Sequence, residues 1–190
     1  MINAQRRWLL SGGIGSGKST VRVLLERSGF ETIDTDSIGH EVLEPNGPAF
    51  DQVVDRWPTV VIDGRIDRKA LGSIVFKDAG ELKALEGITH PYIFGMIDRR
   101  VQLIDRAMIV EIPLLHTSLE AGWRRIVVDS DDKIRLDRLV GRGMVSDDAV
   151  NRMRSQPSRS EWLAKAHLVV PNHGSLEELA ATVRQVFGLL

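Results

Sequence analysis

The sequence lacks cysteine, long apolar runs and any large net charge, and each absence excludes a class of protein. Without cysteine the chain forms neither disulfides nor thiolate metal sites, as is usual in a reducing cytosol. No apolar run approaches the roughly 18 residues of a membrane span. Residues 1–7 also lack the apolar core of a secretory signal. We therefore expect a cytoplasmic protein with no membrane partner.

Charge and histidine spacing exclude two further kinds of site. A formal net charge of −1 leaves no overall basic surface for nucleic acid or acidic lipid. The five histidines fall at no metal-ligand spacing. With 190 residues, 43% of them hydrophobic and 27% charged, the chain has the composition of one ordinary globular domain. We expect a monomer whose partners are small molecules.

One glycine-rich stretch carries the clearest chemical signal. Residues 12–19 fit G-x-x-x-x-G-K-[ST], the phosphate-binding P-loop. Glycines let consecutive backbone N–H groups turn around phosphate oxygens, and the following helix directs its partly positive end at the same anion. The residues expected to bind the nucleotide are Gly12, Gly13, Ile14, Gly15, Ser16, Gly17, Lys18, Ser19 and Thr20.

The flanking sequence supports this interpretation. Residues 7–10 form an apolar run typical of a buried strand, and apolar residues at helical spacing follow the loop until Gly29. A flexible Gly/Ser linker would not stand between a strand and an amphipathic helix. Lys18 supplies a charge to the β- and γ-phosphates, and the Ser19 hydroxyl is a ligand for Mg²⁺. The sequence therefore predicts binding of a nucleoside triphosphate with Mg²⁺.

Two carboxylates follow the second predicted strand, residues 30–33. If the chain stays extended through Thr35, Asp34 and Asp36 point to the same side. A second strand beside the first would bring its carboxyl end next to the P-loop, the edge at which open α/β sheets bind ligands. Alternatively, Asp36 is the N-cap of a helix that starts at Ser37. Capping and catalysis are compatible.

Residues 45–106 read as an insertion. A turn cluster is followed by a short helical pattern, a weak strand and turn at 60–64, and a helix that Asp67 caps. The next helix is expected to break at Gly87, and Pro91 is expected to open a longer one. Because this stretch is too long for a simple crossover, we predict a helical lobe that binds the second substrate.

A continuous apolar run at 107–113 is typical of a central parallel strand, buried on both faces. It holds one acid, Glu111. At the phosphate-facing end of the strand, Glu111 would act like a Walker-B acid and hold a water bound to Mg²⁺. The alternative is an acid at a strand end that contacts an arginine or the backbone. The sequence does not separate the two.

The last third of the chain alternates strands with basic helices. Strands are predicted at 125–128 and 168–170, with a final helix after the second. Between them, Arg135, Arg138 and Arg142 fall three and four residues apart, on one helical face. Glycines on both sides of Arg142 indicate a joint, so this region suits a lid over the triphosphate. The alternative is a basic face in solvent. Five short strands alternating with helices predict a three-layer α/β domain with a parallel sheet.

Taken in order, these motifs resemble the dephospho-coenzyme A kinase family along nearly the whole chain. The P-loop is shared by many families, whereas the Thr-His-Pro and Pro-Leu-Leu elements are far more discriminating. The resemblance rests on residues 11–20, 34–36, 63–68, Leu71, Phe76, 85–86, 88–91, 112–115, Arg138, Arg142, Gln156, Asn172 and Gly174.

The resemblance implies transfer of the γ-phosphoryl group of ATP to the ribose 3′-hydroxyl of dephospho-coenzyme A, the last step of coenzyme A synthesis. It implies an α/β P-loop kinase fold with a five-stranded parallel sheet, an inserted helical substrate lobe and an Arg-rich lid. The expected division is a core of residues 1–44, 107–130 and 166–190, a lobe of residues 45–106 and a lid region of residues 131–165.

Roles carry over position by position. Asp36 would match the catalytic base, with Lys18 and the lid arginine Arg142 at the phosphates. Arg138 and Asn172 would lie at the nucleotide, and Ser19 and Glu111 at the metal. The residues expected at the acceptor substrate are Ser11, Asp34, His90, Pro91 and Leu114.

The chain departs from the family pattern at a few positions, and none of them is Lys18, Ser19, Asp36 or Arg142. The chemistry therefore looks intact. The departures are Ser11 for a usual Thr, Thr35 for Ala, His40 for a common Arg, His116-Thr117 where a Glu is common (Glu120 being the nearest acid), and His167 for Asp.

Two other functions stay open. One is a different small-molecule kinase, such as one acting on nucleoside monophosphates, against which the long insertion and its Thr-His-Pro element argue. The other is an inactive nucleotide-binding regulator, which the departures at His40, Thr117 and His167 motivate.

Overall fold

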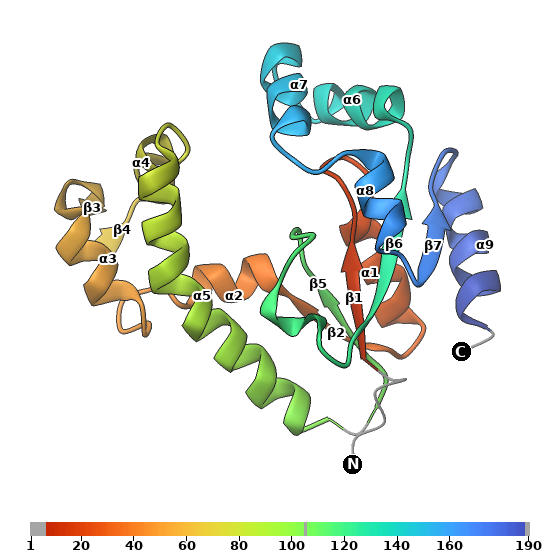
Figure 1. Ribbon diagram of the computed structural model, residues 1–190, viewed down its shortest axis with the longest axis horizontal. Coiled ribbons are helices and arrows are strands. Elements are labelled where there is room, and N and C mark those ends of the chain that lie inside the picture. Colours follow the sequence, from red (N-terminus) through yellow and green to blue (C-terminus); the bar gives the residue numbers. More distant parts are fainter. Residues whose placement is uncertain (1–6, 105, 189–190) are drawn as a thin grey trace. The chain divides into compact units, whose positions relative to one another are not determined.

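The computed structural model describes residues 7–104 and 106–188 (Figure 1). The described chain forms two compact units. We call residues 7–33 and 106–188 the sheet unit, and residues 34–104 the helical unit. The three-part division into core, lobe and lid that the family resemblance implies is a different partition, and it stays a prediction.

A five-stranded parallel sheet is the centre of the sheet unit, as predicted. Leu10 of β1 pairs in parallel register with Glu111 of β5 on one side and with Ile126 of β6 on the other. In spatial order the strands are β2 (Glu31–Asp34), β5 (Met108–Glu111), β1 (Arg7–Ser11), β6 (Arg124–Asp129) and β7 (Leu168–Pro171).

The expectation that the second strand lies beside the first is wrong, because β5 separates β2 from β1. Burial gives the reason. All four residues of β5 are buried, whereas only Ile33 is buried in β2. A continuous apolar strand gains most from a central position, and a strand with half-exposed polar residues fits the edge.

Alternate residues of β6 face opposite sides of the sheet. Ile126 and Val128 join the apolar cluster that α1 and α9 cover, and Val127 packs with Trp162 of α8 instead. Helix α8 has no counterpart among the predicted elements, since its six residues carry too little periodicity. The elements beside the sheet are α1 (Lys18–Arg27), the 3₁₀ turn η3 (Ser118–Glu120), α8 (Arg159–Ala164) and α9 (Leu176–Phe187).

Two basic helices follow β6 and pack against each other, namely α6 (Asp132–Gly141) and α7 (Ser146–Arg154). Beyond α6, Gly143 has a φ of 87°, in the left-handed region that glycine favours after a helix. Val145 is the N-cap residue of α7, and no side chain accepts a capping hydrogen bond from its first N–H groups.

The helical unit has its own apolar core. It contains a predicted turn in which Asp63 and Gly64, with φ of 50° and 72°, join β3 to β4 as an antiparallel hairpin. The elements are α2 (Thr35–Glu41), α3 (Phe50–Arg56), the 3₁₀ turn η2 (Pro58–Val60), β3 (Val61–Ile62), β4 (Arg65–Ile66), α4 (Arg68–Val75) and α5 (Ala79–Gln102). Its buried cluster consists of Val53, Trp57, Val60, Leu71 and Val75.

Helix α5 runs unbroken for 24 residues, so the predicted break at Gly87 and new start at Pro91 are wrong. Pro91 has no N–H for the carbonyl of Gly87, four residues earlier, which costs about 3 kcal/mol in a helix interior. Packing on both sides offsets this cost. Leu85 contacts the apolar cluster before the proline, and Ile97 is fully buried after it.

Helix α2 begins at Thr35, so the condition that the chain stays extended through Thr35 is not met, and the helix starts earlier than the alternative start at Ser37. Asp34, not Asp36, is the N-cap residue, and its Oδ1 accepts a hydrogen bond from the backbone N–H of Asp36 at 2.9 Å. An aspartate at a strand end competes well for the first N–H groups of a helix. Asp36 therefore lies in the first turn, and the two carboxylates do not alternate as on a strand.

Within the described ranges, no helix combines the length and the apolar character that crossing a membrane requires.

The cap of α4 gives a test of local stability. Oδ1 of Asp67 accepts from the N–H groups of Lys69 at 2.8 Å and Ala70 at 3.1 Å. We expect Asp67→Ala to lower the free energy of unfolding by about 1 kcal/mol, because two N–H groups lose their acceptor. Urea denaturation measures the change. Asp55→Ala, an exposed position within α3, is the control and should stay within about 0.5 kcal/mol. Equal stability of the two variants would contradict the capping role.

Candidate functional site

The glycine-rich loop lies where the sequence predicts it, between β1 and α1. Gly17 is the N-cap residue of α1 and has a φ of 97°, in the left-handed region. A Cβ atom at Gly17 would collide with Nδ2 of Asn172, and one at Gly13 would collide with the guanidinium of Arg135. At Gly17 both the backbone conformation and the close approach of Asn172 therefore favour glycine, whereas at Gly13 the obstacle is the end of the Arg135 side chain. The order of strand, loop and helix is that of a P-loop.

Side chains from the last third of the chain hold the backbone of this loop. The N–H of Ile14 donates to Oε1 of Gln156 at 2.7 Å, and the carbonyl of Ile14 accepts from Nε of Arg135 at 2.8 Å. Both polar backbone groups of one loop residue are thus bound by distant residues. These two bonds restrict the backbone of the loop at Ile14.

A second cluster holds the carbonyl of Ser16. It accepts from Nδ2 of Asn172 at 2.7 Å and from Nη1 of Arg138 at 3.4 Å. Arg138 also donates to Oδ1 of Asn172 and to Oγ of Ser130, each at 3.0 Å. Burial lowers the pKa of Arg138, and the nearby charge of Arg142 lowers it further. Two of the residues predicted at the nucleotide, Arg138 and Asn172, thus contact the loop directly.

Lys18 also contacts the loop. Its Nζ donates to the carbonyl oxygens of Gly12 at 3.0 Å and Gly13 at 3.3 Å. The lysine charge therefore lies directly beside the loop backbone.

Glu111 lies at the carboxyl end of β5 and contacts two residues of α1. Ser19 Oγ donates to one carboxylate oxygen at 2.8 Å, and Nε of Arg22 donates to the other at 3.0 Å. The contact with an arginine is the one that the second alternative expects, and a role of Glu111 at Mg²⁺ stays a prediction. Hydroxyl and carboxylate oxygens are the hard ligands that Mg²⁺ prefers, so this donor set fits the ion.

Ser11 is fully buried, and its Oγ accepts from Nη1 of Arg125 at 2.7 Å. Arg125 also donates to the carbonyls of Leu114 at 3.0 Å and Leu115 at 2.8 Å, and to Glu120 at 3.1 Å. Burial lowers the pKa of Arg125, and Glu120 opposes that shift. One buried arginine thus joins Ser11 and Leu114, and their contact with the acceptor substrate stays a prediction.

Departures from the family pattern take part in the same network. Nδ1 of His167 accepts a hydrogen bond from the backbone N–H of Arg125 at 3.0 Å. The backbone N–H of His167 donates to the carbonyl of Arg125 at 2.8 Å. The family often has a glutamate shortly after the Pro-Leu-Leu element, and in this chain the nearest acid to that position is Glu120. Glu120 forms an ion pair with the Arg125 guanidinium. Both residues therefore stabilise the sheet through Arg125.

Asp129 ends β6 beside the loop and is bound on both carboxylate oxygens by Arg159, at 2.7 Å each. His173 approaches the same carboxylate at 3.6 Å. The hydrogen bonds from Arg159 hold the pKa of Asp129 below its usual value, although burial opposes them. Arg159 thus fastens the start of α8 to the end of β6.

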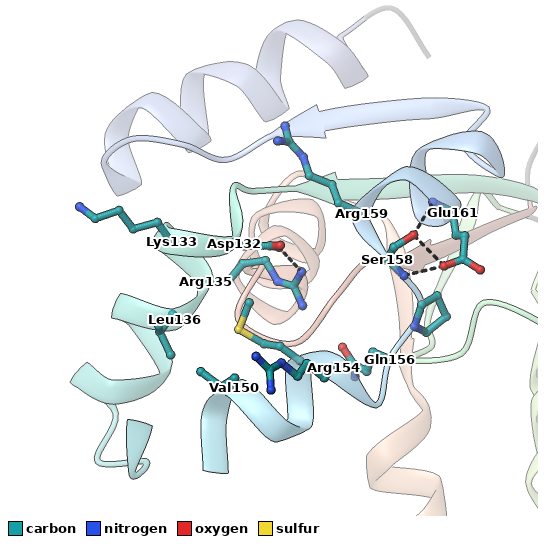
Figure 2. A pocket seen from close by; sticks show the side chains of 12 residues that line it. Asp132, Lys133, Arg135, Leu136, Val150, Arg154, Gln156, Ser158, Arg159 and Glu161 are labelled. Carbon is teal, nitrogen blue, oxygen red and sulfur yellow. Dashed lines mark hydrogen bonds and ion pairs between the residues drawn. The ribbon is translucent and has the colours of Figure 1, made fainter. Parts of the chain in front are cut away.

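Figure 2 shows a cavity of about 610 Å³ between α6, α7 and the start of α8. Arg135, Arg154 and Gln156 contribute polar groups to it. Because Arg135 and Gln156 also bind Ile14, the cavity lies beside the phosphate loop. Arg142 is exposed at the end of α6, and its role at the phosphates stays a prediction. Apolar walls come from Leu136, Val150, Met153 and Pro157.

The remaining predicted residues belong to the helical unit. Asp34 caps α2, and Asp36 is exposed in its first turn. His90 is half-buried in α5 with its ring against Phe94, at 5.3 Å between centroids, and Pro91 is exposed. The role of Asp36 as catalytic base and the contacts of the other three residues with the acceptor substrate stay predictions.

Sequence reasoning assigned no role to several residues that shape this site. Gln156 appeared only as part of the family pattern, which was its sole signal. Arg22 had none, because one arginine on an amphipathic helix is ordinary. Arg135 was placed on a basic face, but its burial against the loop depends on tertiary packing that spacing does not reveal.

The bond between Gln156 and Ile14 can be tested by removing its acceptor. We expect Gln156→Ala to raise the dissociation constant for ATP about two- to tenfold, because a net hydrogen bond that preorganises the loop is lost. Isothermal titration calorimetry measures the change. The matched control is Gln185→Ala, at an exposed position of α9. Unchanged affinity in Gln156→Ala would show that the loop keeps its shape without this bond.

Comparison with known proteins agrees with this geometry. The family model described as dephospho-CoA kinase matches residues 9–178. A dephospho-CoA kinase of Streptomyces avermitilis is 41% identical over 186 residues, which cover 94% of this chain and 90% of the relative. A dephospho-CoA kinase of Symbiobacterium thermophilum is 38% identical over 186 residues, which cover 92% of this chain and 77% of the relative.

Solved structures give the same result. The crystal structure of TT1252 from Thermus thermophilus has a TM-score of 0.80 and 31% identity, and 96% of each chain is covered. A dephospho-CoA kinase from Campylobacter jejuni has a TM-score of 0.67 and 29% identity, with 97% of this chain and 96% of the other covered. A shikimate kinase from Bacteroides thetaiotaomicron, at a TM-score of 0.51 and 13% identity, shares the fold alone. The chain therefore belongs to the dephospho-CoA kinase family.

Proposed function

We propose that this chain transfers the γ-phosphoryl group of ATP to the ribose 3′-hydroxyl of dephospho-coenzyme A, giving coenzyme A and ADP in the last step of coenzyme A synthesis. Family membership supports the acceptor and the reaction. The observation that carries the proposal is the P-loop, whose Ile14 and Ser16 are held in place while Lys18 and Ser19 begin α1.

Phosphoryl transfer passes through a loose transition state, so the protein mainly positions the reactants and neutralises charge. The 3′-oxygen forms a bond to the γ-phosphorus while the bond from that phosphorus to the bridging oxygen of ADP breaks. Lys18 would neutralise charge on the β- and γ-phosphates, and the loop N–H groups would bind their oxygens.

Ser19 and Glu111 would hold Mg²⁺, Ser19 through its hydroxyl and Glu111 through a bound water. Their contact at 2.8 Å supports this pairing, because it brings a hydroxyl and a carboxylate together at the start of α1. The ion would supply positive charge between the β- and γ-phosphates. Arg22, bound to the second oxygen of Glu111, would fix the orientation of the carboxylate.

Asp36 would orient the 3′-hydroxyl and accept its proton as general base. The carboxyl ends of parallel strands share one edge of a sheet, and Asp36 follows the end of β2 by two residues. The hydrogen bond from its N–H to Asp34 would fix the backbone that carries it. Asp34 would assist at the acceptor.

The helical unit would bind the acceptor. His90 and Pro91 of α5 are the residues that the family pattern assigns to it, and a hollow of about 540 Å³ in this unit is lined by His40, Ile66 and residues 67–69. Arg138 and Asn172 would contact the nucleotide. Arg142 would reach the phosphates when the lid region closes.

The proposed setting is the cytoplasm, with the chain acting as a monomer. The reaction is tested by a coupled assay of ADP release with dephospho-coenzyme A, AMP and adenosine as acceptors. We expect ADP only with dephospho-coenzyme A, and coenzyme A as the product in mass spectrometry. Release with AMP would favour a nucleoside monophosphate kinase. Binding of ATP without release on any acceptor would favour a nucleotide-binding regulator.

Replacing the proposed base tests its role. We expect Asp36→Asn to lower kcat by about 10²- to 10⁴-fold at saturating ATP, because the amide cannot accept the hydroxyl proton. Asp51→Asn, an exposed aspartate in the first turn of α3, is the control for a lost charge at a helix start. A decrease in Asp36→Asn of less than about tenfold would contradict the base role.

The metal pairing has its own test. We expect Glu111→Gln to raise the Mg²⁺ concentration for half-maximal activity about tenfold or more, since outer-sphere partners of a metal typically contribute this much. A Mg²⁺ titration at fixed ATP measures it. Glu26→Gln is the matched control, because Glu26 also pairs with Arg22, at 2.7 Å, on its exposed side. Identical Mg²⁺ dependence in both variants would exclude Glu111 from the metal site.

A further inference from the structure

A small cavity of about 10 Å³ lies between the phosphate loop, the end of β6 and helices α6 and α8. Ser16 contributes to it from the loop, Asp129 from β6, Arg135 from α6 and Trp162 from α8. It is distinct from the larger cavity of Figure 2, although Arg135 and Arg159 line both.

Three buried polar atoms belong to residues that line this cavity, and each has no hydrogen-bond partner in the part of the chain that the structure describes. They are Oγ of Ser16, Nη2 of Arg135 and Nε1 of Trp162. The three residues are 1%, 4% and 2% exposed, so bulk water does not reach them. Within residues 7–104 and 106–188, only Nε of Arg7 shares this condition elsewhere.

The other two nitrogens of the Arg135 guanidinium have partners. Its Nε donates to the carbonyl of Ile14 at 2.8 Å, and its Nη1 donates to Asp132 at 2.9 Å. These two bonds hold the guanidinium plane, so turning Nη2 toward another acceptor would disturb the bond to the loop. Buried polar groups in native proteins almost always have a partner, so a partner for these atoms is expected inside the cavity.

We propose that this cavity is a binding site for one water molecule, which joins Ser16 of the phosphate loop to Arg135 and Trp162. The water accepts hydrogen bonds from Nη2 of Arg135 and Nε1 of Trp162 and donates one to Oγ of Ser16. Its second hydrogen points to the carboxylate of Asp129, which lines the same space.

Size and chemistry agree on this ligand. A single buried water needs roughly 10–15 Å³ and two to four polar partners, and the cavity offers about 10 Å³ and three unpaired groups. Two unpaired N–H donors, one of them on a charged guanidinium, disfavour a cation. The volume is too small for a phosphate or another polyatomic anion.

The water makes Trp162 a positioning residue for nucleotide binding. Its ring packs against Val127 and Leu115. Its N–H would donate a hydrogen bond to the water, and the water would donate one to Ser16. The phosphate loop would then be bound at Ile14 by Gln156 and Arg135, and at Ser16 by Asn172 and this water. The effect on ATP rests on the proposed function, whereas the water itself does not.

A crystal structure of the nucleotide-free protein at about 1.8 Å or better tests the site directly. We expect a single solvent peak within about 3.2 Å of Oγ of Ser16, Nη2 of Arg135 and Nε1 of Trp162. In Trp162→Phe, which keeps the aromatic packing and removes the N–H, the peak should weaken or move. A wild-type map without this peak, or with the three side chains bonded to one another, would overturn the proposal.

Binding measurements test the positioning role. We expect Trp162→Phe to raise the dissociation constant for ATP about two- to fivefold, as one lost hydrogen bond in a network would, and to leave kcat at saturating ATP within about twofold. Trp123→Phe, a buried tryptophan of the sheet unit that does not line this cavity, is the control for lost ring area. Equal affinity in wild type and Trp162→Phe would overturn the positioning role. An inactive wild type that still shows the water would instead contradict the proposed function alone.

Discussion

The hydrogen bonds that hold the backbone of the phosphate loop are the constraint on which the sheet unit depends. A loop with left-handed glycines is costly to fix, since glycine loses more conformational freedom on folding than any other residue. Its buried N–H and carbonyl groups also need partners. Gln156, Arg135, Arg138 and Asn172 supply them, and they come from α6, from the segment before α8 and from the end of β7. Those elements must therefore lie near the end of β1. The sheet order places them there, because β6 pairs with β1 and β7 pairs with β6 on the same side.

Arginine does much of this structural work. Arg22 donates a hydrogen bond to the carboxylate of Glu111. Arg125 joins Ser11, Leu115 and Glu120. Arg159 donates to both carboxylate oxygens of Asp129 through two nitrogens. The planar guanidinium suits this use because it offers several donors in a fixed geometry. Arg135 and Arg138 are likewise bonded to the loop backbone. A basic helix beside a phosphate site is therefore partly a scaffold, and its charges do not all serve the ligand.

Local patterns predicted the parts of the fold that local physics decides. The strand, loop and helix around residues 12–17, the cap at Asp67 and the final helix after the strand at 168–170 all lie where the sequence indicates. The failures occurred where tertiary packing decides. Pro91 lies inside α5 because apolar contacts on both sides outweigh the missing bond, and β5 rather than β2 takes the place beside β1 because it is buried throughout.

The candidate site was predictable to the same extent. Motif and resemblance selected Lys18, Ser19, Glu111 and Asn172 as candidates, and the structure brings Ser19 to Glu111 and Asn172 to the loop. Gln156 and Trp162 received no role, because a neutral amide and an indole carry no sequence signal of what they touch. Asp36 follows β2 as expected, but α2 starts at Thr35, so the carboxylate that caps this helix is that of Asp34 and not that of Asp36. Competition between two adjacent carboxylates for the same N–H groups is not resolved by spacing.

The sequence distance between the loop and its supports also governs when the loop can form during synthesis. Ile14 is 142 positions from Gln156, and Ser16 is 156 positions from Asn172. A nascent chain leaves the ribosome from its N-terminus, so the glycine stretch emerges early and stays without these supports until most of the polypeptide has been translated. The loop therefore gains its full set of hydrogen bonds only after the C-terminal third has been translated.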